Sequence, residues 1–318
     1  MRRIVILDES YRNWILDATF TESAEAIGVS IEKFFYRTSR VSLQRNFVFK
    51  EIKKLSKLES TKMWLATHRI LEKFGGFVPS DCFLPKNSRV LISHLSDEDS
   101  DSRLFYNLRD FEKILTYNKE IYDHLLNIGF DRNQVRVIGG AVNRNVFSPL
   151  KKDNLTQWSK GFVLIAGDAK PRKRPQLVFE VISLLTDINF VIHGRDWQKY
   201  CPTNLLNSPN ISFIDFEMVN HPSLMRSADL YLSLSEVEGG PFSTLEALAS
   251  GTPVVVTNVG WNSEYVKNGI GSILERDATL DDITSAIKNS LALKETLRHK
   301  DLIPGEALWH QLGEKVYG

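Results

Sequence analysis

The sequence predicts an α/β protein with two doubly wound domains, and three observations carry that prediction. The chain has 318 residues, about twice the usual length of one domain. Short apolar, β-branched runs alternate with helical patterns along its second half, which is typical of parallel strands joined by helices. The composition, 42% hydrophobic and 25% charged, is that of an ordinary folded protein and excludes a disordered, collagen-like or low-complexity chain.

The second half contains the clearer elements. Near-continuous apolar runs, as expected of strands buried on both faces of a parallel sheet, lie at 162–166, 190–193, 211–214, 230–234, 254–257 and 272–274. Helical periodicity predicts helices over 175–185, 242–250 and 281–291. Pro241 is suited to begin the second of these helices, and Gly251 to end it.

The first half has a weaker pattern. Strands are expected at 3–8, 89–94, 113–117 and 135–139, a helix at 118–127, and mostly basic helices between residues 20 and 80. Both patterns are interrupted at 148–152, which places the domain boundary at residue 150, with an N-terminal domain over 1–150 and a C-terminal domain over 151–318. The amphipathic segment 306–317 predicts a terminal helix that packs back on the first domain.

Charge and cysteine content limit the function classes. The 40 Lys and Arg balance 39 Asp and Glu, so no net field attracts nucleic acid. Cys82 and Cys201 lie too far apart for a metal knuckle or a disulfide framework and are typical of reduced thiols. The sequence shows no signal peptide and no apolar run of ~20 residues. We therefore expect a cytoplasmic protein, with peripheral attachment to the inner face of a membrane as a variant of that expectation.

The stretch from Lys33 to Lys73 is strongly basic, with eleven Lys or Arg against three Glu. Aromatic residues are interleaved with these charges. Two interpretations stay open: amphipathic helices with charged outer faces, or attachment to an anionic membrane surface.

The strongest functional signal is a strand that runs into Gly239 and Gly240 and then into a helix that begins near Pro241. Glycines let backbone approach a ligand closely, and the first turn of a helix offers unpaired N–H groups to a phosphate. Glu238 lies before this helix and Glu246 on it, with seven residues between them, so the two carboxylates can bind different hydroxyls of one extended ligand. A nucleotide sugar fits this combination.

Residues 238–255 resemble the donor-site motif of retaining GT-B glycosyltransferases of family 4, the glycosyl transferases group 1. The resemblance implies a GT-B fold, with two Rossmann-like domains facing across a cleft. It implies transfer of a sugar from a nucleotide diphosphate to a glycan or lipid-linked acceptor, with retention of configuration and without a metal or other cofactor. Assembly of bacterial-type surface polysaccharide or glycoconjugate is the expected setting.

Two further segments resemble the same family. In 162–175, Gly167 and Lys173 match the loop that grips the donor diphosphate, but Asp168 stands where the family has arginine. A carboxylate cannot replace a guanidinium against phosphate, so we expect Arg172 or Arg174 to supply the second positive charge. Residues 135–149 resemble the exit from the family's first domain, with Asn143 in place of the usual aspartate.

The resemblance assigns roles to residues. Glu238, Lys173 and His94 are the expected catalytic residues, with Glu238 near the donor-sugar hydroxyls and His94 facing the donor sugar. Glu246 is expected to bind the ribose. The expected donor-binding residues are Gly167, Arg172, Arg174, Gly239, Gly240, Pro241, Phe242, Ser243 and Glu246. A histidine that is merely hydrogen-bonded at a strand end is the alternative for His94.

Other functions stay open or are disfavoured. A non-catalytic GT-B domain that binds a nucleotide sugar or a partner, and a GT-B epimerase or phosphorylase, are the alternatives. Asp99 and Asp101 form an Asp-x-Asp pair, which we interpret as an exposed acidic loop and not as a metal site. The sequence lacks a Walker loop, a dinucleotide-binding glycine motif, a zinc-protease motif and a nucleophile elbow.

Overall fold

The computed structural model describes residues 2–8, 15–36, 61–65, 87–94, 108–109, 111–149, 161–297, 300–303 and 307–318. The chain divides into two compact units. One comprises Met1–Ala141 together with Glu306–Gly318, and the other comprises Val142–Gly305. Along the sequence, the boundary between the units therefore follows Ala141, ahead of the expected boundary at residue 150. The last residues of the chain belong to the first unit.

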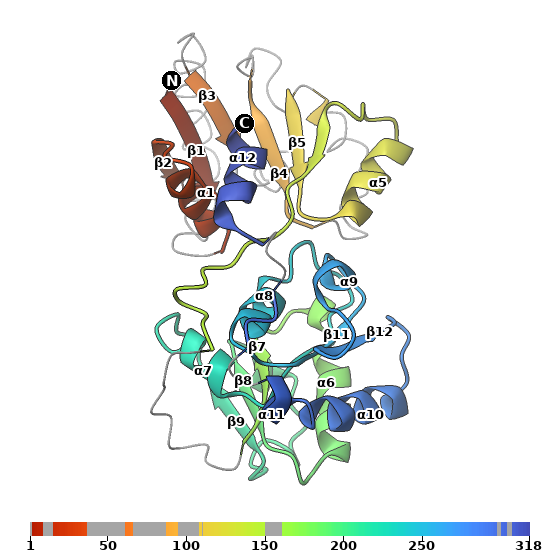
Figure 1. Cartoon of the computed structure of the whole chain (residues 1–318). Helices are drawn as coiled ribbons and strands as arrows, with labels where there is room; N and C mark the ends of the chain where they lie inside the picture. Colours follow the sequence, from red (N-terminus) through yellow and green to blue (C-terminus); the bar gives the residue numbers. More distant parts are fainter. Residues whose placement is uncertain are drawn as a thin grey trace. The chain divides into compact units, whose positions relative to one another are not determined.

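The second unit contains a parallel six-stranded sheet in the order β12-β11-β10-β7-β8-β9 (Figure 1). Its strands are β7 (Val163–Ala166), β8 (Phe190–His193), β9 (Ile211–Ile214), β10 (Leu230–Ser233), β11 (Val254–Thr257) and β12 (Gly271–Leu274). This is the Rossmann order, in which the chain moves outward from β7 in one direction and then from β10 in the other. Loops after β7 and β10 diverge at this switch point, where ligands of open α/β sheets bind.

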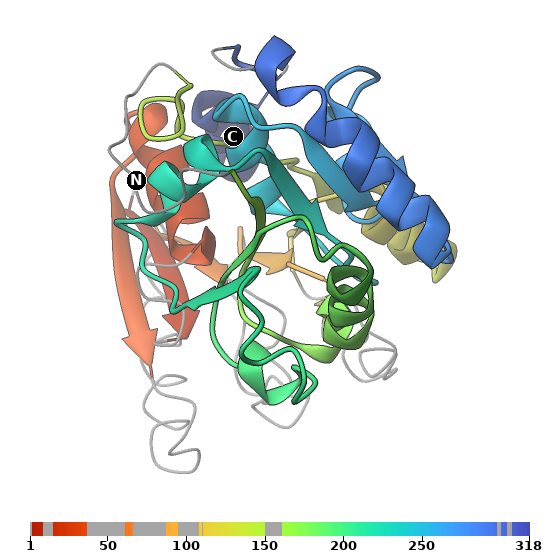
Figure 2. The same ribbon diagram turned by 90° about the horizontal axis from the view of Figure 1, so that it is seen from below.

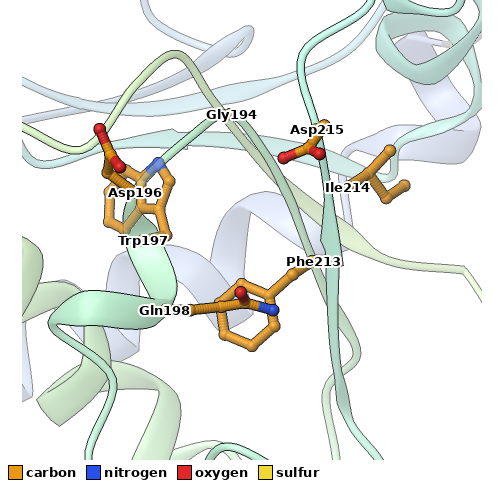
Figure 3. A pocket seen from close by; sticks show the side chains of 7 residues that line it. All are labelled: Gly194, Asp196, Trp197, Gln198, Phe213, Ile214 and Asp215. Carbon is orange, nitrogen blue, oxygen red and sulfur yellow. The ribbon is translucent and has the colours of Figure 1, made fainter.

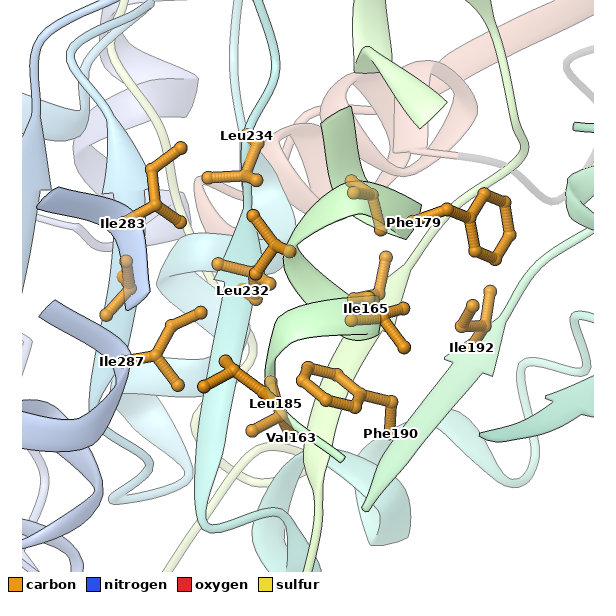
Figure 4. Close-up of a cluster of buried hydrophobic side chains, with 14 of the residues drawn as sticks. Val163, Ile165, Phe179, Leu185, Phe190, Ile192, Leu232, Leu234, Ile283 and Ile287 are labelled. Carbon is orange, nitrogen blue, oxygen red and sulfur yellow. The ribbon is translucent and has the colours of Figure 1, made fainter. Parts of the chain in front are cut away.

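Helices cover both faces of this sheet. They are α6 (Pro175–Leu184), α7 (His221–Ser227), α8 (Phe242–Ala249), α9 (Asn262–Tyr265), α10 (Leu280–Leu291) and α11 (Lys294–Leu297). Helices α6 and α10 lie side by side in both views (Figures 1 and 2) and pack against each other. Figure 4 shows their apolar side chains, among them Phe179 and Ile283, meeting Ile165 and Leu232 of the central strands in one buried cluster. Burial of this cluster fixes the strands that present the loops of the site.

The first unit contains a second parallel sheet, in the order β2-β1-β3-β4-β5-β6. Its strands are β1 (Arg2–Asp8), β2 (Ile31–Tyr36), β3 (Thr61–Leu65), β4 (Arg89–Ile92), β5 (Lys113–Thr116) and β6 (Val135–Val137), and its helices are α1 (Ile15–Ala26), α5 (Lys119–Asn127) and α12 (Trp309–Tyr317). The expectation of mostly helical structure between residues 20 and 80 is wrong for β2 and β3. β2 is an edge strand with Phe34 partly exposed, so its charged residues conceal the apolar pattern of a strand.

Helix α12 packs against α1 of the same unit. The Tyr317 hydroxyl donates to the Phe20 carbonyl over 2.8 Å. Arg89 donates to the carbonyls of Val316 and Gly318 over 2.7 and 2.8 Å, so the buried guanidinium fastens the last turn. A Cβ at Gly313 would lie 2.3 Å from the Ser23 carbonyl oxygen, which explains a glycine in mid-helix.

Several predictions fall partly or wholly outside the described residues. Most of the basic stretch lies there, as do Asp99, Asp101 and Cys82. Of that stretch, Lys33 on β2 makes a 2.8 Å ion pair with Asp17 of α1 and thus serves the fold of the first unit. Among the helices that the structure describes, none combines the length and the hydrophobicity that a bilayer crossing requires.

Candidate functional site

The candidate site is built from the two loops at the switch point of the second sheet. The loop after β7 contains Gly167 and a short 3₁₀ turn, Pro171–Lys173, and the loop after β10 contains Glu238. The Glu236 N–H donates to the Arg172 carbonyl over 2.7 Å. This bond holds the two loops together, so their side chains share one location.

Glu238 is the centre of a charge cluster between these loops. Its Oε1 lies 2.6 Å from Arg172 Nη1 and 3.0 Å from Lys173 Nζ. The Ser235 hydroxyl donates to the same oxygen over 3.0 Å. Only 9% of the Glu238 side chain is exposed, so the structure brings together three of the sequence-predicted residues in a nearly water-free place.

The cluster also fixes the protonation state of Glu238. Burial alone would raise the pKa of this carboxyl group, because it disfavours the charged form. The charges of Lys173 and Arg172, and their hydrogen bonds, outweigh burial and lower the pKa of Glu238 to about 2. The residue is therefore a carboxylate at any physiological pH, able to accept hydrogen bonds but not to act as a general acid.

The start of α8 lies beside this cluster. Pro241 precedes the first helical residue, Phe242, and no side chain caps the helix, so its positive dipole end faces this loop. A Cβ at Gly240 would lie 2.5 Å from the ring of Trp261. Gly240 is thus required by packing against a buried tryptophan, a reason that the motif itself does not reveal.

Glu246 lies on α8 and is held by histidine. Its Oε2 is 2.9 Å from Nε2 of His221, the first residue of α7. The Nδ1 atom of His221 is in turn 3.2 Å from Nδ1 of His193, at the end of β8, and both histidines are buried. The second carboxylate of the motif therefore has a histidine as its hydrogen-bond partner, whereas the first has two cations.

Tyr231 is a fully buried residue of β10, next to the loop of the site. Its side chain points to the face of the sheet opposite Leu232, and its hydroxyl hydrogen-bonds with Ser243 at the start of α8. Burial, and then the charges of Glu238 and Glu246, raise the pKa of this buried hydroxyl. Both carboxylates thus contribute to the electrostatic surroundings of one buried phenol.

Arg174 does not face this cluster. It has a left-handed backbone, φ 48°, and its guanidinium donates to the carbonyls of Leu234 and Arg276 over 2.7 and 2.6 Å. These bonds brace the loops after β10 and β12. Of the two arginines expected to supply the second charge, the structure places Arg172 in the cluster and gives Arg174 a structural position.

Asp168, the departure from the family pattern, holds an arginine of its own. Arg195, in the loop after β8, donates from Nη2 to Asp168 Oδ2 over 2.5 Å and from Nε to both carboxylate oxygens over 3.1 Å. The Arg195 side chain is still 61% exposed. A guanidinium therefore lies at this edge of the sheet after all, on a different loop.

Asn143, the second departure, preserves a turn. Its side-chain oxygen accepts the Asn145 N–H over 3.1 Å, a bond that aspartate would make equally well. The turn leads to Phe147, whose ring meets His221 edge-on at 5.9 Å between centroids. This replacement leaves the local structure intact.

His94 belongs to the other unit. It lies two residues beyond the end of β4, where its Nδ1 is 3.1 Å from the Ser93 hydroxyl. It is placed at the carboxyl edge of the first sheet, as the sequence predicts, and its role toward a donor sugar stays a prediction.

A small pocket opens beside the site, at the ends of β8 and β9 (Figure 3). It has a volume of about 160 Å³ and is lined by Gly194, Asp196, Trp197, Gln198, Phe213, Ile214 and Asp215. Gly194 connects the pocket to the cluster, because a Cβ there would lie 2.1 Å from the Gly167 carbonyl oxygen. Within the described parts of the chain, no group of three or more His, Cys, Asp or Glu residues is arranged to hold a metal ion.

Sequence reasoning missed three members of this site: His193, His221 and Arg195. His193 ends a strand, Arg195 follows one and His221 begins a helix, but their spacing in the sequence forms no motif. The one available signal was that His193 ends an otherwise apolar strand. Their meeting depends on the neighbouring positions of β8, α7 and α8 in the fold.

Residues 147–301 match a known family, described as glycosyl transferases group 1. Two curated relatives are each 27% identical to this chain. One is an N,N'-diacetylbacillosaminyl-diphospho-undecaprenol α-1,3-N-acetylgalactosaminyltransferase of Campylobacter jejuni, matched over 56% of this chain and 50% of the relative. The other is a UDP-Gal:α-D-GlcNAc-diphosphoundecaprenol α-1,3-galactosyltransferase of Escherichia coli, matched over 49% of this chain and 44% of the relative. The chain thus spans about half the length of the curated relatives it matches.

Solved structures resemble nearly the whole chain. The Anabaena protein HepE in complex with UDP and glucose has a TM-score of 0.74 at 14% identity, over 99% of this chain and 98% of that one. A glycosyltransferase of Rickettsia africae has a TM-score of 0.72 at 14% identity, over 99% and 93%. These likenesses confirm the predicted fold class, GT-B with two Rossmann-like units.

Proposed function

Because residues 147–301 make this chain a member of the glycosyl transferases group 1 family, we propose that it transfers a sugar from a nucleotide diphosphate to a lipid-linked or glycan acceptor. The observation that carries the proposal is the cluster of Glu238, Arg172 and Lys173 at the switch point of a Rossmann sheet. The cluster combines cations for a diphosphate with a carboxylate for sugar hydroxyls.

The chemistry of sugar transfer requires stabilisation of negative charge on the departing diphosphate. Lys173 Nζ is suited to this task, since it lies 3.5 Å from where a Cβ of Gly167 would be and so faces a side-chain-free stretch of loop. Arg172 and the N–H groups at the start of α8 add to the positive potential. These groups are held in place before the ligand arrives, which makes them effective in the transition state.

The two glutamates have different tasks in this proposal. Glu238, fixed as an anion by its cations, accepts hydrogen bonds from hydroxyls of the donor sugar. Glu246 accepts from the ribose. Neither carboxylate is needed as a base, because the departing phosphate can take the proton of the acceptor hydroxyl on the same face of the sugar. The proposal therefore includes retention of configuration and activity without a metal.

The acceptor proposal draws on the relatives. Both curated relatives are named for acceptors linked to undecaprenyl diphosphate. We therefore propose a lipid-linked acceptor and a site of action at the cytoplasmic face of a membrane, in the assembly of a surface polysaccharide or glycoconjugate. The basic stretch from Lys33 to Lys73 would then contact anionic lipid, which sedimentation with liposomes of neutral or anionic composition tests directly.

The first experiment is a donor panel. UDP-, GDP- and ADP-sugars are incubated with the protein, with and without EDTA, and release of nucleoside diphosphate is measured. We expect slow hydrolysis of one donor, unaffected by EDTA. Lys173→Ala should reduce this rate by ~10²–10³, the usual cost of losing one preorganised charge-stabilising group. Lys288→Ala, which removes an exposed ammonium on α10 of the same unit, is the matched control.

The alternatives give other outcomes. Binding of a donor without release of sugar identifies a non-catalytic nucleotide-sugar-binding domain. Turnover without release of free nucleoside diphosphate identifies an epimerase or a phosphorylase. Full activity of Lys173→Ala removes the assigned role of Lys173, and inversion at the anomeric carbon of the product, read by NMR, removes the retaining mechanism.

A further inference from the structure

A chain of hydrogen bonds crosses three elements of the second unit and ends on Glu246. It begins at the Glu217 N–H, which lies 3.1 Å from Nε2 of His193. It continues from His193 Nδ1 to His221 Nδ1 over 3.2 Å and from His221 Nε2 to Glu246 Oε2 over 2.9 Å. The exposed fractions of His193 and His221 are 0% and 2%, so no bulk water competes for these bonds.

The Glu217 N–H, at the start of this series of hydrogen bonds, determines which ring nitrogen of each histidine carries a proton. The Glu217 N–H can only donate, so His193 Nε2 accepts and carries no proton. The one proton of neutral His193 is then on Nδ1 and is donated to His221 Nδ1. His221 in turn carries its proton on Nε2, which donates to Glu246. The three bonds are therefore consistent with one arrangement of protons only.

The same reasoning excludes a charged histidine at the Glu246 end. A second proton on His221 would be on its Nδ1 atom. It would then point at the proton that His193 carries on its own Nδ1 atom. The surroundings agree: Phe216 stacks on His193 at 4.8 Å and Phe147 meets His221 edge-on at 5.9 Å between ring centroids. Burial, with the nearby His221 second, lowers the pKa of His193 to about 4, so this ring is neutral at physiological pH.

A neutral donor has a consequence that a cation would not have. It holds Oε2 of Glu246 in place without cancelling the carboxylate charge, whereas Glu238 is compensated by Lys173 and Arg172. Among the described residues, Glu246 Oε1 has no hydrogen-bond partner, so this oxygen is available to a ligand. An uncompensated carboxylate is a strong acceptor for two adjacent hydroxyls.

We propose that His221 is the positioning residue for Glu246, set in its tautomer by His193, and that the carboxylate so held selects ligands with a ribose 2′,3′-diol. This inference rests on the proposed function, because it concerns the nucleotide part of the proposed donor. It adds two residues to the site: the histidine pair makes the proposed contact between Glu246 and the ribose depend on residues that never touch the ligand.

The test compares two variants of His221, one that keeps a hydrogen-bond donor to Glu246 and one that loses it. His221→Gln keeps an N–H donor near the place of Nε2, whereas His221→Phe keeps an aromatic ring between Phe147 and Phe216 and loses the donor. Calorimetry measures the dissociation constants of UDP, GDP and ADP and of the 2′,3′-dideoxy analogue of each. Circular dichroism and thermal melts confirm that both variants are folded.

We expect the dissociation constant of the ribonucleotide to be ~10–100-fold lower than that of its dideoxy analogue in the unmodified protein. This ratio corresponds to the usual contribution of hydrogen bonds to a charged group. His221→Phe should lose at least ten-fold of this preference with little change in affinity for the dideoxy analogue, and His221→Gln should keep it within about three-fold. An unchanged preference in His221→Phe overturns the proposal. So does an equal loss of affinity for both ligands, which would mean a merely structural role.

A second measurement separates this inference from the proposed function. Nitrogen-15 NMR of the ligand-free protein reports the tautomer of each histidine. We expect the Nδ1–H form for His193 and the Nε2–H form for His221 at pH 7, and any other pair of forms overturns the positioning role. If these tautomers are found but the unmodified protein binds none of the nucleotides, the proposed function and the diol preference fail, and the positioning of Glu246 stands.

Discussion

At the scale of single residues, Glu238 is the carboxylate that pairs with two cations of the site. Its carboxylate is nearly buried and is shared by Arg172 and Lys173, whose own side chains are 33% and 17% exposed. Removing the negative charge leaves two cations close together without compensation. The residue should therefore matter for stability as well as for catalysis.

We expect Glu238→Gln to lower the free energy of unfolding by ~1–3 kcal/mol and to reduce donor hydrolysis by at least ~10²-fold. Urea denaturation and the donor assay measure the two effects. Glu236→Gln is the matched control, because Glu236 lies in the same loop but is exposed. A variant at residue 238 that behaves like this control would show that the ion cluster is incidental.

The residues of the site could be predicted where a motif fixes their spacing on one loop. Glu238, Glu246 and the start of α8 are such residues, and so is Lys173. Arg195 and the histidine pair were not predictable, because each acts on a residue of a different strand or helix. Arg174 was assigned to the diphosphate because a basic turn gives no sign of which side chain turns toward backbone carbonyls.

At the scale of elements, the junction of β8 and α7 is sensitive to pH. The pKa of His193 is about 4 in the folded protein, against an ordinary value near 6.5 in the unfolded chain. Between these two values the unfolded state binds more protons, so acid favours unfolding. The stability that comes from a neutral His193 is present above pH ~6.5 and is lost as pH falls towards 4.

We expect the free energy of unfolding to fall by ~1–3 kcal/mol more between pH 6.5 and 4 in the unmodified protein than in His193→Asn. Asparagine keeps a polar group near Nδ1 but does not titrate. Urea denaturation at pH 7, 5.5 and 4.5 makes the comparison. The low pKa of Glu238 adds a loss of stability in acid that is common to both proteins, so the comparison cancels it. Parallel curves for the two proteins would contradict the prediction.

Elements were predictable in proportion to their burial. The bounds of β8 and β11 follow from continuous apolar runs, because both faces of these strands are covered. Edge strand β2 was mistaken for helix, since its charged side chains break the pattern. Helix α7 was missed because His221–Ser227 is short and has too few apolar positions to show a period.

At the scale of the whole molecule, the two units depend differently on the ends of the chain. The first unit is discontinuous, since α12 at the C-terminus completes the packing of α1 near the N-terminus. The second unit is one continuous segment with its own core. The family match at 147–301 lies inside the range Val142–Gly305 of the second unit, so the matched segment and its supporting core coincide.

Damage to α12 should consequently weaken the first unit and spare the second. In Gly313→Val, a Cβ would lie 2.3 Å from the Ser23 carbonyl oxygen, so the helix must move away from α1 and lose the bond between Tyr317 and Phe20. We expect a loss of ~2–4 kcal/mol of local stability. Hydrogen exchange read by mass spectrometry should show faster exchange in α1 and β1, with β7, β8 and β10 unchanged.

The control for this experiment is Glu314→Gln, which alters the neighbouring residue on the exposed side of the same helix. Its exchange pattern should match that of the unmodified protein. Nucleotide binding by Gly313→Val should also be retained, because the residues that we assign to the donor all lie in the second unit except His94. Faster exchange throughout both sheets would mean that the chain unfolds as a single cooperative body, and the separation of the two units would then be geometric only.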